Sequence, residues 1–400
     1  MTSPTTTSDR PLRCLHYVDA VVEEAGGVVR AVLDLTAALA QQGIGGRGIE
    51  VTLLTGDAQD VPKSWLADES GTPRVEVISR SLTPWLSLGT ADREAVSAAV
   101  AAADVVHLHT PWDPCNVAIA AEARRTGTPY MVSVHGMLDD WSMTQRGLKK
   151  RVYLSVAGRR MLEGAARIHF TAEGERQQAM KLAPRGSAVV LPLVMDLSPY
   201  RTLPGPQIAR DTFADLQRDG AKLLFLSRVH PKKGVELLIE AVAAMRKRGD
   251  AVTALIAGPG DAAYVESLKQ LATKLGVTDD VCFLGMVRGE AKLSLYQACD
   301  LFVLPTSQEN FGIVLTEAMA CATPIVTTRG VDIWQELQDR DAVIVDATPP
   351  ALVEAIDQLL AEGDKLKTRG ERSRTAVLDW LDPQTVVSQY VDLYRQCCRA

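Results

Sequence analysis

The sequence has 400 residues, 46% of them hydrophobic and 23% charged, which is long enough for two or three domains with separate cores. Its formal net charge of -6 argues against a dedicated nucleic-acid-binding protein, because such proteins usually carry a basic surplus. Apolar runs fall short of the roughly 20 residues that span a bilayer. Residues 1–9 are polar and the seven cysteines are scattered, so we expect a protein without a secretion signal, with reduced thiols, in the cytoplasm.

Short apolar segments alternate with amphipathic segments along both halves of the chain. In the first half we expect strands at 12–18, 51–55, 75–79, 104–109, 130–134, 168–171 and 188–191, with helices at 28–42, 116–125 and 148–163. In the second half we expect strands at 222–227, 252–257, 281–284, 301–304, 325–328 and 342–345, with helices at 235–248, 312–321 and 350–360. This alternation predicts parallel sheets that helices cover on both faces.

The alternation breaks at 196–219, a segment rich in proline and weak in periodicity, which is typical of a linker. We therefore expect an α/β protein of two Rossmann-like domains, 1–197 and 198–382, that face each other across a cleft. A last helix, within 383–400, would cross back onto the first domain. In open α/β sheets ligands bind beyond the carboxyl ends of the strands, so the loops after each strand are the places to search.

The strongest signal is a pair of carboxylates, Glu309 and Glu317, separated by seven residues. Glu309 lies in a loop after a predicted strand, and Gly312 begins the next helix. The free amides of Phe311, Gly312 and Ile313 would favour anionic groups there, and each carboxylate could accept hydrogen bonds from ligand hydroxyls. The alternative is a solvated Glu309 and a salt-bridged Glu317.

The second signal is the run Ser-Arg-Val-His-Pro-Lys-Lys-Gly at 227–234, which also follows a strand and precedes a helix. The guanidinium of Arg228 and the ammonium of Lys233 suit a diphosphate, one as a planar fork and the other as a point charge. The alternative is a solvated basic turn.

Two weaker signals lie in the first half. Gly26 and Gly27 separate the first strand from the first helix, where they would allow a phosphate or an acceptor to approach the backbone. His135 and Gly136 follow a strand directly, which makes His135 a candidate site residue. The alternatives are a simple turn and a hydrogen-bonded structural histidine.

Two further patterns are imperfect. Gly258 and Gly260 follow a strand and resemble a dinucleotide fingerprint, but Pro259 interrupts that turn, so we interpret the segment as a close-approach loop near the donor. His107 and His109 alternate on one strand face as a metal pair could. No carboxylate completes that set locally, so we expect no metal site.

The run 227–234 together with 309–324 resembles glycosyltransferase family 4 of the GT-B fold, which consists of two Rossmann-like domains. The stretches 109–112 and 135–139 look like bacterial members of that family tied to surface-polysaccharide assembly. One departure is Ala322, which stands where the family usually has glycine.

The resemblance implies roles for individual residues. Arg228 and Lys233 would bind the donor diphosphate, Glu317 the ribose, and Glu309 the transferred sugar. The implied catalytic residues are His135, Arg228, Lys233 and Glu309, and the implied donor-binding residues are Gly26, Gly27, Arg228, Lys233, Gly258, Glu309, Asn310, Phe311, Gly312, Ile313 and Glu317. No metal or other cofactor is implied.

The implied activity is retaining, metal-independent transfer of a hexose from a nucleotide-diphosphate sugar to a glycan, a lipid-linked molecule or a small molecule. A sugar-nucleotide epimerase or a phosphorylase on the same fold, a nicotinamide oxidoreductase and a non-catalytic binding protein remain alternatives. The basic amphipathic segment 145–160 predicts a peripheral contact with the inner face of a membrane, with a solvated helix face as its alternative.

Overall fold

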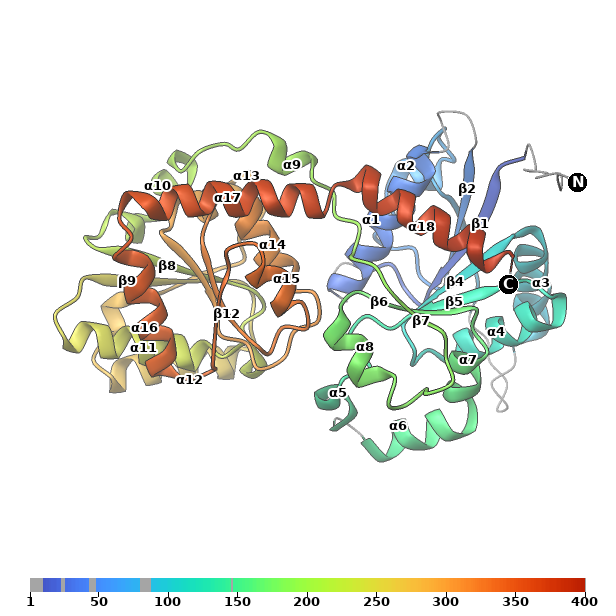
Figure 1. The fold of residues 1–400 in the computed structure, drawn as a ribbon, viewed down its shortest axis with the longest axis horizontal. Helices are drawn as coiled ribbons and strands as arrows, with labels where there is room; N and C mark the ends of the chain where they lie inside the picture. Colours follow the sequence, from blue (N-terminus) through green and yellow to red (C-terminus); the bar gives the residue numbers. More distant parts are fainter. Residues whose placement is uncertain (1–9, 23–25, 43–47, 80–87, 145–146, 400) are drawn as a thin grey trace, which may run out of the picture. The chain divides into compact units, whose positions relative to one another are not determined.

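The computed structural model describes residues 10–22, 26–42, 48–79, 88–144 and 147–399, and the polar segment 1–9 lies outside them. The chain divides into two compact units, Met1–Asp196 with Pro383–Ala400, and Leu197–Asp382. Each unit contains one parallel sheet flanked by helices, so the predicted α/β class is confirmed (Figure 1). Among the described helices, none combines the length and the apolar character that crossing a bilayer requires.

The first unit is built on a seven-stranded sheet of order β3-β2-β1-β4-β5-β6-β7. Its strands are β1 (Leu12–Val18), β2 (Ile49–Thr55), β3 (Arg74–Val77), β4 (Val105–His109), β5 (Tyr130–Ser133), β6 (Arg167–Phe170) and β7 (Ala188–Val190). Its helices are α1 (Gly27–Gln42), α2 (Lys63–Leu66), α3 (Thr90–Ala102), α4 (Pro114–Thr126), α5 (Asp140–Thr144), α6 (Gly147–Tyr153), the π-helical turn η3 (Leu154–Gly158), α7 (Arg159–Glu163), α8 (Glu173–Ala179) and α18 (Pro383–Cys397).

Helix α18 belongs to the first unit although it follows the second unit in sequence. Its residues Tyr390 and Tyr394 are buried with Leu35 and Leu39 of α1 against β1, β2, β4 and β5. Every residue of β4 is buried, as expected for a central strand of a parallel sheet that helices cover on both faces. Because β1, β4 and β5 are adjacent and parallel, their carboxyl ends lie at the same edge of the sheet, and the loops that follow them lie together.

The second unit has a six-stranded sheet of order β10-β9-β8-β11-β12-β13. Its strands are β8 (Ala221–Leu226), β9 (Val252–Ala257), β10 (Val281–Gly285), β11 (Leu301–Leu304), β12 (Ile325–Thr328) and β13 (Val343–Val345). Its helices are α9 (Ser198–Arg201), α10 (Gln207–Thr212), η4 (Ala214–Gln217), η5 (Pro231–Lys233), α11 (Val235–Lys247), α12 (Ala262–Lys274), η6 (Thr278–Asp280), α13 (Gly289–Ala298), α14 (Ile313–Ala320), α15 (Trp334–Gln338), α16 (Pro349–Leu360) and α17 (Asp364–Trp380).

The segment predicted as a linker at 196–219 is instead a packed part of the second unit. It forms α9, α10 and η4, and α10 packs against α13. Tyr200 is 4% exposed, and the buried Ala209 donates its backbone N–H to Ser294 Oγ at 2.9 Å. The linker interpretation was wrong because these helices are too short to produce a helical periodicity in the sequence.

The C-terminus of α14 explains why the departure at position 322 matters. The N–H of Ala322 bonds the Met319 carbonyl at 2.9 Å, and the N–H of Thr323 bonds the Ala318 carbonyl at 3.0 Å, which is the Schellman pattern. This pattern requires a left-handed residue after the helix, and Ala322 has φ +61°. Glycine adopts that conformation without the steric cost of about 1–2 kcal/mol that alanine carries.

We predict that Ala322→Gly stabilises the protein by about 0.5–1 kcal/mol, because relief of the left-handed strain exceeds the extra unfolded-state entropy of glycine. Urea denaturation measures the change. Ala318→Gly, the same exchange inside α14, is the control and should destabilise by about 1 kcal/mol or more. A loss of stability in Ala322→Gly would show that the φ value at this position is not strained.

Candidate functional site

In the second unit, the loops that follow β8 and β11 are held against each other at the carboxyl edge of the sheet. The carbonyl of Lys232 accepts hydrogen bonds from the Ser307 N–H at 2.8 Å and from Thr306 Oγ1 at 2.9 Å. Gly234 has φ +69°, and a Cβ there would overlap the Pro305 carbonyl oxygen. The two segments that the sequence singled out separately, 227–234 and 309–317, are thus parts of one site.

The side chains of Lys233 and Glu309 form an ion pair across these two loops. Lys233 is only 5% exposed, and burial lowers its pKa to about 7, with further lowering by the charges of Lys232 and Arg228. The contact with Glu309 opposes this shift, because a carboxylate favours the charged ammonium. Lys233, Lys232 and Arg228 thus lie close enough to lower one another's charged-state stability, and an added anion would be favourable beside them.

Helix α14 begins at this site with backbone donors from three successive residues. Gly312 caps the helix with φ +66°, and Phe311 stacks on Trp380 with ring centroids 5.7 Å apart. Within the described part of the chain, the amides of Phe311, Gly312 and Ile313 have no acceptor. Free N–H groups at a helix N-terminus are a favourable environment for anions and for ligand oxygens.

Glu317 lies one turn further along α14 and is buried in a polar cluster that the sequence did not reveal. Its carboxylate accepts hydrogen bonds from Tyr200 at 2.8 Å and Tyr296 at 3.1 Å, and it pairs with Lys292 at 2.7 Å. An ionised carboxylate accepts about four hydrogen bonds, so one position remains for a ligand hydroxyl. The salt bridge that was the alternative interpretation of Glu317 is therefore present. The two tyrosines lie on other helices, and no local sequence pattern indicates that these helices contact α14.

The loop after β9 has a packing reason for its first glycine. Gly258 has φ +133°, and a Cβ at this position would overlap the Ser227 carbonyl oxygen, so glycine lets this loop touch the loop after β8. Asp261 caps α12 by accepting from the Tyr264 N–H at 3.0 Å. A protein carboxylate thus occupies the helix terminus where a dinucleotide fingerprint would place a pyrophosphate, which disfavours the oxidoreductase alternative.

The remaining candidates lie in the first unit, at the carboxyl edge of its own sheet. Gly26 has φ +93° and directly precedes α1, which begins at Gly27, while residues 23–25 lie outside the described chain. His135 follows β5 with φ +53°, a conformation that non-glycine residues seldom adopt. The adjacent Gly136 N–H donates to Glu175 Oε1 at 2.6 Å, and this bond helps to hold the strained turn in place.

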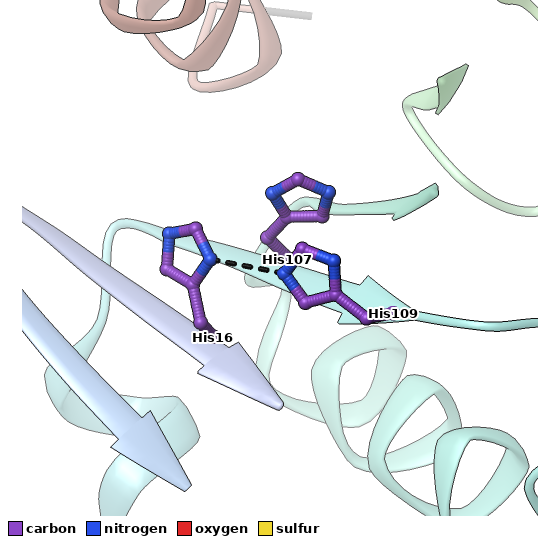
Figure 2. Close-up of side chains that lie close together, drawn as sticks. All are labelled: His16, His107 and His109. Atoms are coloured by element: carbon purple, nitrogen blue, oxygen red, sulfur yellow. Dashed lines mark hydrogen bonds between the residues drawn. The ribbon is translucent and has the colours of Figure 1, made fainter. Parts of the chain in front are cut away.

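Two further imidazoles lie behind the side chain of His135 in a hydrogen-bonded row. His135 Nε2 lies 3.0 Å from His109 Nδ1. His109 Nε2 lies 3.1 Å from His16 Nδ1, and Figure 2 shows this second bond. His16, on β1, was missed because a single histidine in an apolar strand gives no signal. Within the described chain, His16, His107 and His109 form the one group of three residues close enough to share a metal ion, with ring nitrogens within 4.8 Å.

Comparison with protein families gives matches to both units. The family described as "Glycosyl transferase 4-like domain" matches residues 26–193, and "Glycosyl transferases group 1" matches residues 211–376. The chain is similar to the D-inositol 3-phosphate glycosyltransferase of Frankia alni, with 27% identity over 85% of this chain and 87% of that protein. The corresponding protein of Geodermatophilus obscurus is 32% identical over 49% of this chain and 45% of its own.

Solved structures agree on the fold. HepE of Anabaena in complex with UDP has a TM-score of 0.75 and 20% identity, with coverage of 96% of this chain and 99% of that chain. WaaG, a glycosyltransferase involved in lipopolysaccharide biosynthesis, has a TM-score of 0.67 and 18% identity, with coverage of 95% and 99%. The chain therefore belongs to glycosyltransferase family 4, has the GT-B fold, and is an enzyme that transfers a sugar from a nucleotide-sugar donor.

Proposed function

We propose that the second unit binds the donor, with its diphosphate beside Arg228 and Lys233. The observation that carries this proposal is the convergence of a buried ammonium, an exposed guanidinium and three free backbone amides at one sheet edge. Fixed donors and cations of this kind are the groups that hold a diphosphate. Glu309 then contacts the transferred sugar, and the remaining acceptor position of Glu317 takes a ribose hydroxyl.

Charge development during transfer explains why these groups would accelerate the reaction. Breaking the bond between the sugar and the diphosphate builds negative charge on the departing phosphate and positive charge on the sugar ring. Arg228, Lys233 and the α14 amides stabilise the first charge from fixed positions, with little reorganisation. The carboxylate of Glu309, which pairs with Lys233, is proposed to stabilise the positive charge of the ring.

We propose further that transfer retains the anomeric configuration, needs no metal and moves a hexose. Two cations and a helix terminus supply the charge that a metal would otherwise supply at the diphosphate. Among the similar structures, HepE has also been solved in complex with UDP-glucose, which makes UDP-glucose the first donor to test.

The acceptor is proposed to bind in the first unit. A pocket of about 640 Å³ opens beyond β1 and β4, lined among others by Asp19, Trp112 and Asp113. Carboxylates and an aromatic ring are the side chains that commonly hold sugars and other polyols, through hydroxyl hydrogen bonds and stacking. We therefore propose a polyhydroxylated acceptor, which includes glycans, lipid-linked sugars and small polyols.

We predict that Arg228→Ala and Lys233→Ala each lower kcat/KM for sugar transfer by on the order of 10²–10³-fold, because each removes a charge that acts on the leaving group. Transfer from UDP-glucose to a panel of glycosides and inositols is measured, with the anomer of the product read by NMR. Turnover should persist in EDTA.

The matched control is Lys274→Ala, which removes one charge from an exposed position on α12 of the same unit and should keep the wild-type rate. Wild-type turnover in both site variants would refute the donor site. Epimerised donor, or sugar release that depends on phosphate when donor is supplied alone, would favour the alternative activities instead.

We predict that donor binding weakens as the pH rises above 7. Burial lowers the pKa of Lys233 to about 7, while Glu309 and a bound diphosphate both raise it, so the protonated form binds best. Affinity is complete below pH 7 and falls by up to about tenfold per pH unit above it, until the pKa of the complex is reached. Calorimetry with UDP-glucose between pH 6.5 and 9 measures this, together with the accompanying proton uptake.

Two variants separate Lys233 from its neighbours in this experiment. Lys233→Arg keeps a permanent charge and should bind with no pH dependence in this range. His230→Gln should behave like the wild type, because burial and nearby cations lower the pKa of His230 from 6.5, and it titrates below the window. A flat wild-type profile would contradict a titrating Lys233.

The helical segment 147–163, which consists of α6, η3 and α7, supports a proposed peripheral contact with an anionic membrane. Its inner face is buried through Leu154, while Leu148, Val152 and Val156 are 79%, 54% and 73% exposed along one stripe. Exposed Lys149 and Arg151 flank that stripe. Apolar side chains beside basic ones match the interface of an anionic bilayer. Residues 145–146 lie outside the described chain, and the cytoplasmic location stays a prediction.

We predict that the protein sediments with phosphatidylglycerol vesicles at low salt, less at high salt, and less with phosphatidylcholine vesicles. The triple change of Leu148, Val152 and Val156 to Ser should reduce binding at least tenfold. Met286→Ser, which alters an exposed apolar side chain of the second unit, is the control. Equal sedimentation of the wild type and both variants, or no sedimentation of the wild type, would contradict the membrane contact and favour a solvated helix face.

A further inference from the structure

Five of the six histidines of the chain belong to one hydrogen-bonded series inside the first unit. The series runs through His135, His109, His16, Tyr394, His107, Ser133 and His169 and ends on the backbone carbonyl of Leu191. Strands β1, β4, β5 and β6 and helix α18 contribute its members. All except the partly exposed His135 are at most 1% exposed.

The carbonyl at the far end fixes the direction of the first bonds. Leu191 O can only accept, so His169 Nε2, 3.0 Å away, carries a proton. Burial lowers the pKa of His169 to about 4, so at neutral pH its Nδ1 is bare and accepts from the Ser133 hydroxyl at 2.6 Å. Ser133 then has no proton left to donate, and it accepts from His107 Nε2–H at 2.6 Å.

The same reasoning passes through helix α18. Burial also lowers the pKa of His107 well below its usual value, so its bare Nδ1 accepts from the Tyr394 hydroxyl at 2.9 Å. The oxygen of Tyr394 must therefore accept from His16 Nε2, which lies 3.4 Å away. His16 Nδ1 in turn accepts from His109 Nε2–H at 3.1 Å, the bond drawn in Figure 2.

The last step reaches the candidate site. His109 Nδ1 is bare and accepts from His135 Nε2–H at 3.0 Å. Within the described part of the chain, no partner is found for His135 Nδ1. We propose that this series fixes His135 as its Nε2–H tautomer, so that Nδ1 accepts a hydrogen bond from a substrate hydroxyl, with Tyr394 as the positioning residue. The assignment of a substrate rests on the proposed transferase function, whereas the tautomers do not.

A metal ion held by His16, His107 and His109 is the competing explanation of this cluster. Both ring nitrogens of His107 and of His109 already bond to protein atoms. The centroids of the two rings lie 4.1 Å apart and their planes are tilted by 31°. The hydrogen-bond series accounts for every one of these contacts with consistent donors and acceptors.

The test is Tyr394→Phe, which removes one hydroxyl from the middle of the series. His16 Nε2–H would then be a buried donor without an acceptor, which is unfavourable. Moving the proton of His16 from Nε2 to Nδ1 relieves this. The change converts His16, His109 and His135 together from the Nε2–H to the Nδ1–H tautomer. In protein with ¹⁵N-labelled histidine at pH 7, long-range ¹H–¹⁵N spectra should show five Nε2–H tautomers in the wild type. The variant should show three Nδ1–H tautomers, with His107 and His169 unchanged.

Tyr390→Phe is the matched control, since it makes the same change one turn earlier on α18. Tyr390 donates to the Pro192 carbonyl at 3.1 Å, and its oxygen accepts a side branch of the series from His169 Nε2–H at 3.1 Å. His169 keeps the Leu191 carbonyl in this variant, so all five tautomers should stay as in the wild type. Sugar transfer should lose about tenfold in kcat/KM in Tyr394→Phe, equivalent to one neutral hydrogen bond, and little in Tyr390→Phe.

An Nδ1–H tautomer at any of the five histidines of the wild type would overturn the proposal, as would unchanged tautomers in Tyr394→Phe. Stoichiometric zinc binding that abolishes the Nε2–H signals would support the metal explanation instead. If the protein transfers no sugar but the tautomers are as stated, the series stands and the proposed function fails. If the protein transfers sugar but the tautomers differ from those stated, the series fails and the proposed function stands.

Discussion

The candidate donor site depends on one contact between loops, in which the backbone of 232–234 packs directly against 305–307. This contact buries Lys233 beside Glu309. Burial destabilises the charged ammonium, so a bound anion would stabilise it. Glycine at 234 is what permits the approach. The chemistry of the site therefore follows from main-chain packing, and the side chains act from positions that the packing assigns.

Both units use the same strategy of supporting a functional side chain by buried polar groups behind it. In the second unit, Tyr200 of α9 and Tyr296 and Lys292 of α13 hold Glu317. In the first unit, imidazoles and the Tyr394 hydroxyl support His135, whose backbone is kept in a left-handed turn through Glu175 and Gly136. Such supporting groups fix orientation and protonation before a ligand arrives, which lowers the reorganisation needed during the reaction.

Much of the fold could be predicted, because buried strands of parallel sheets read as continuous apolar runs. The strand expected at 12–18 has the same bounds as β1, and the motifs after β8 and β11 were placed at the correct sheet edge. Helix α17 was missed because eight of its 17 residues are charged and only three are buried, so it has little apolar periodicity. The packed helices at 198–217 were missed because each is too short to show a period.

The site was less predictable than the fold, since its contacts join segments far apart in sequence. No pattern near Glu317 indicates Tyr200, 117 residues away, and none near His107 indicates Tyr394, 287 residues away. Alternation on β4 did reveal that His107 and His109 face one side, but not that β1 adds a third imidazole and α18 a hydroxyl. Sequence spacing gives the residues on one element, whereas tertiary packing decides which elements meet.

Hydrogen exchange at the start of α14 tests the central claim most directly, because that claim assigns a ligand to backbone amides that the protein leaves without acceptors. UDP-glucose should slow exchange at residues 311–313 and across 228–234 together, relative to the free protein. Unchanged exchange in both segments at saturating UDP-glucose, or protection confined to another part of the second unit, would contradict the proposed donor site.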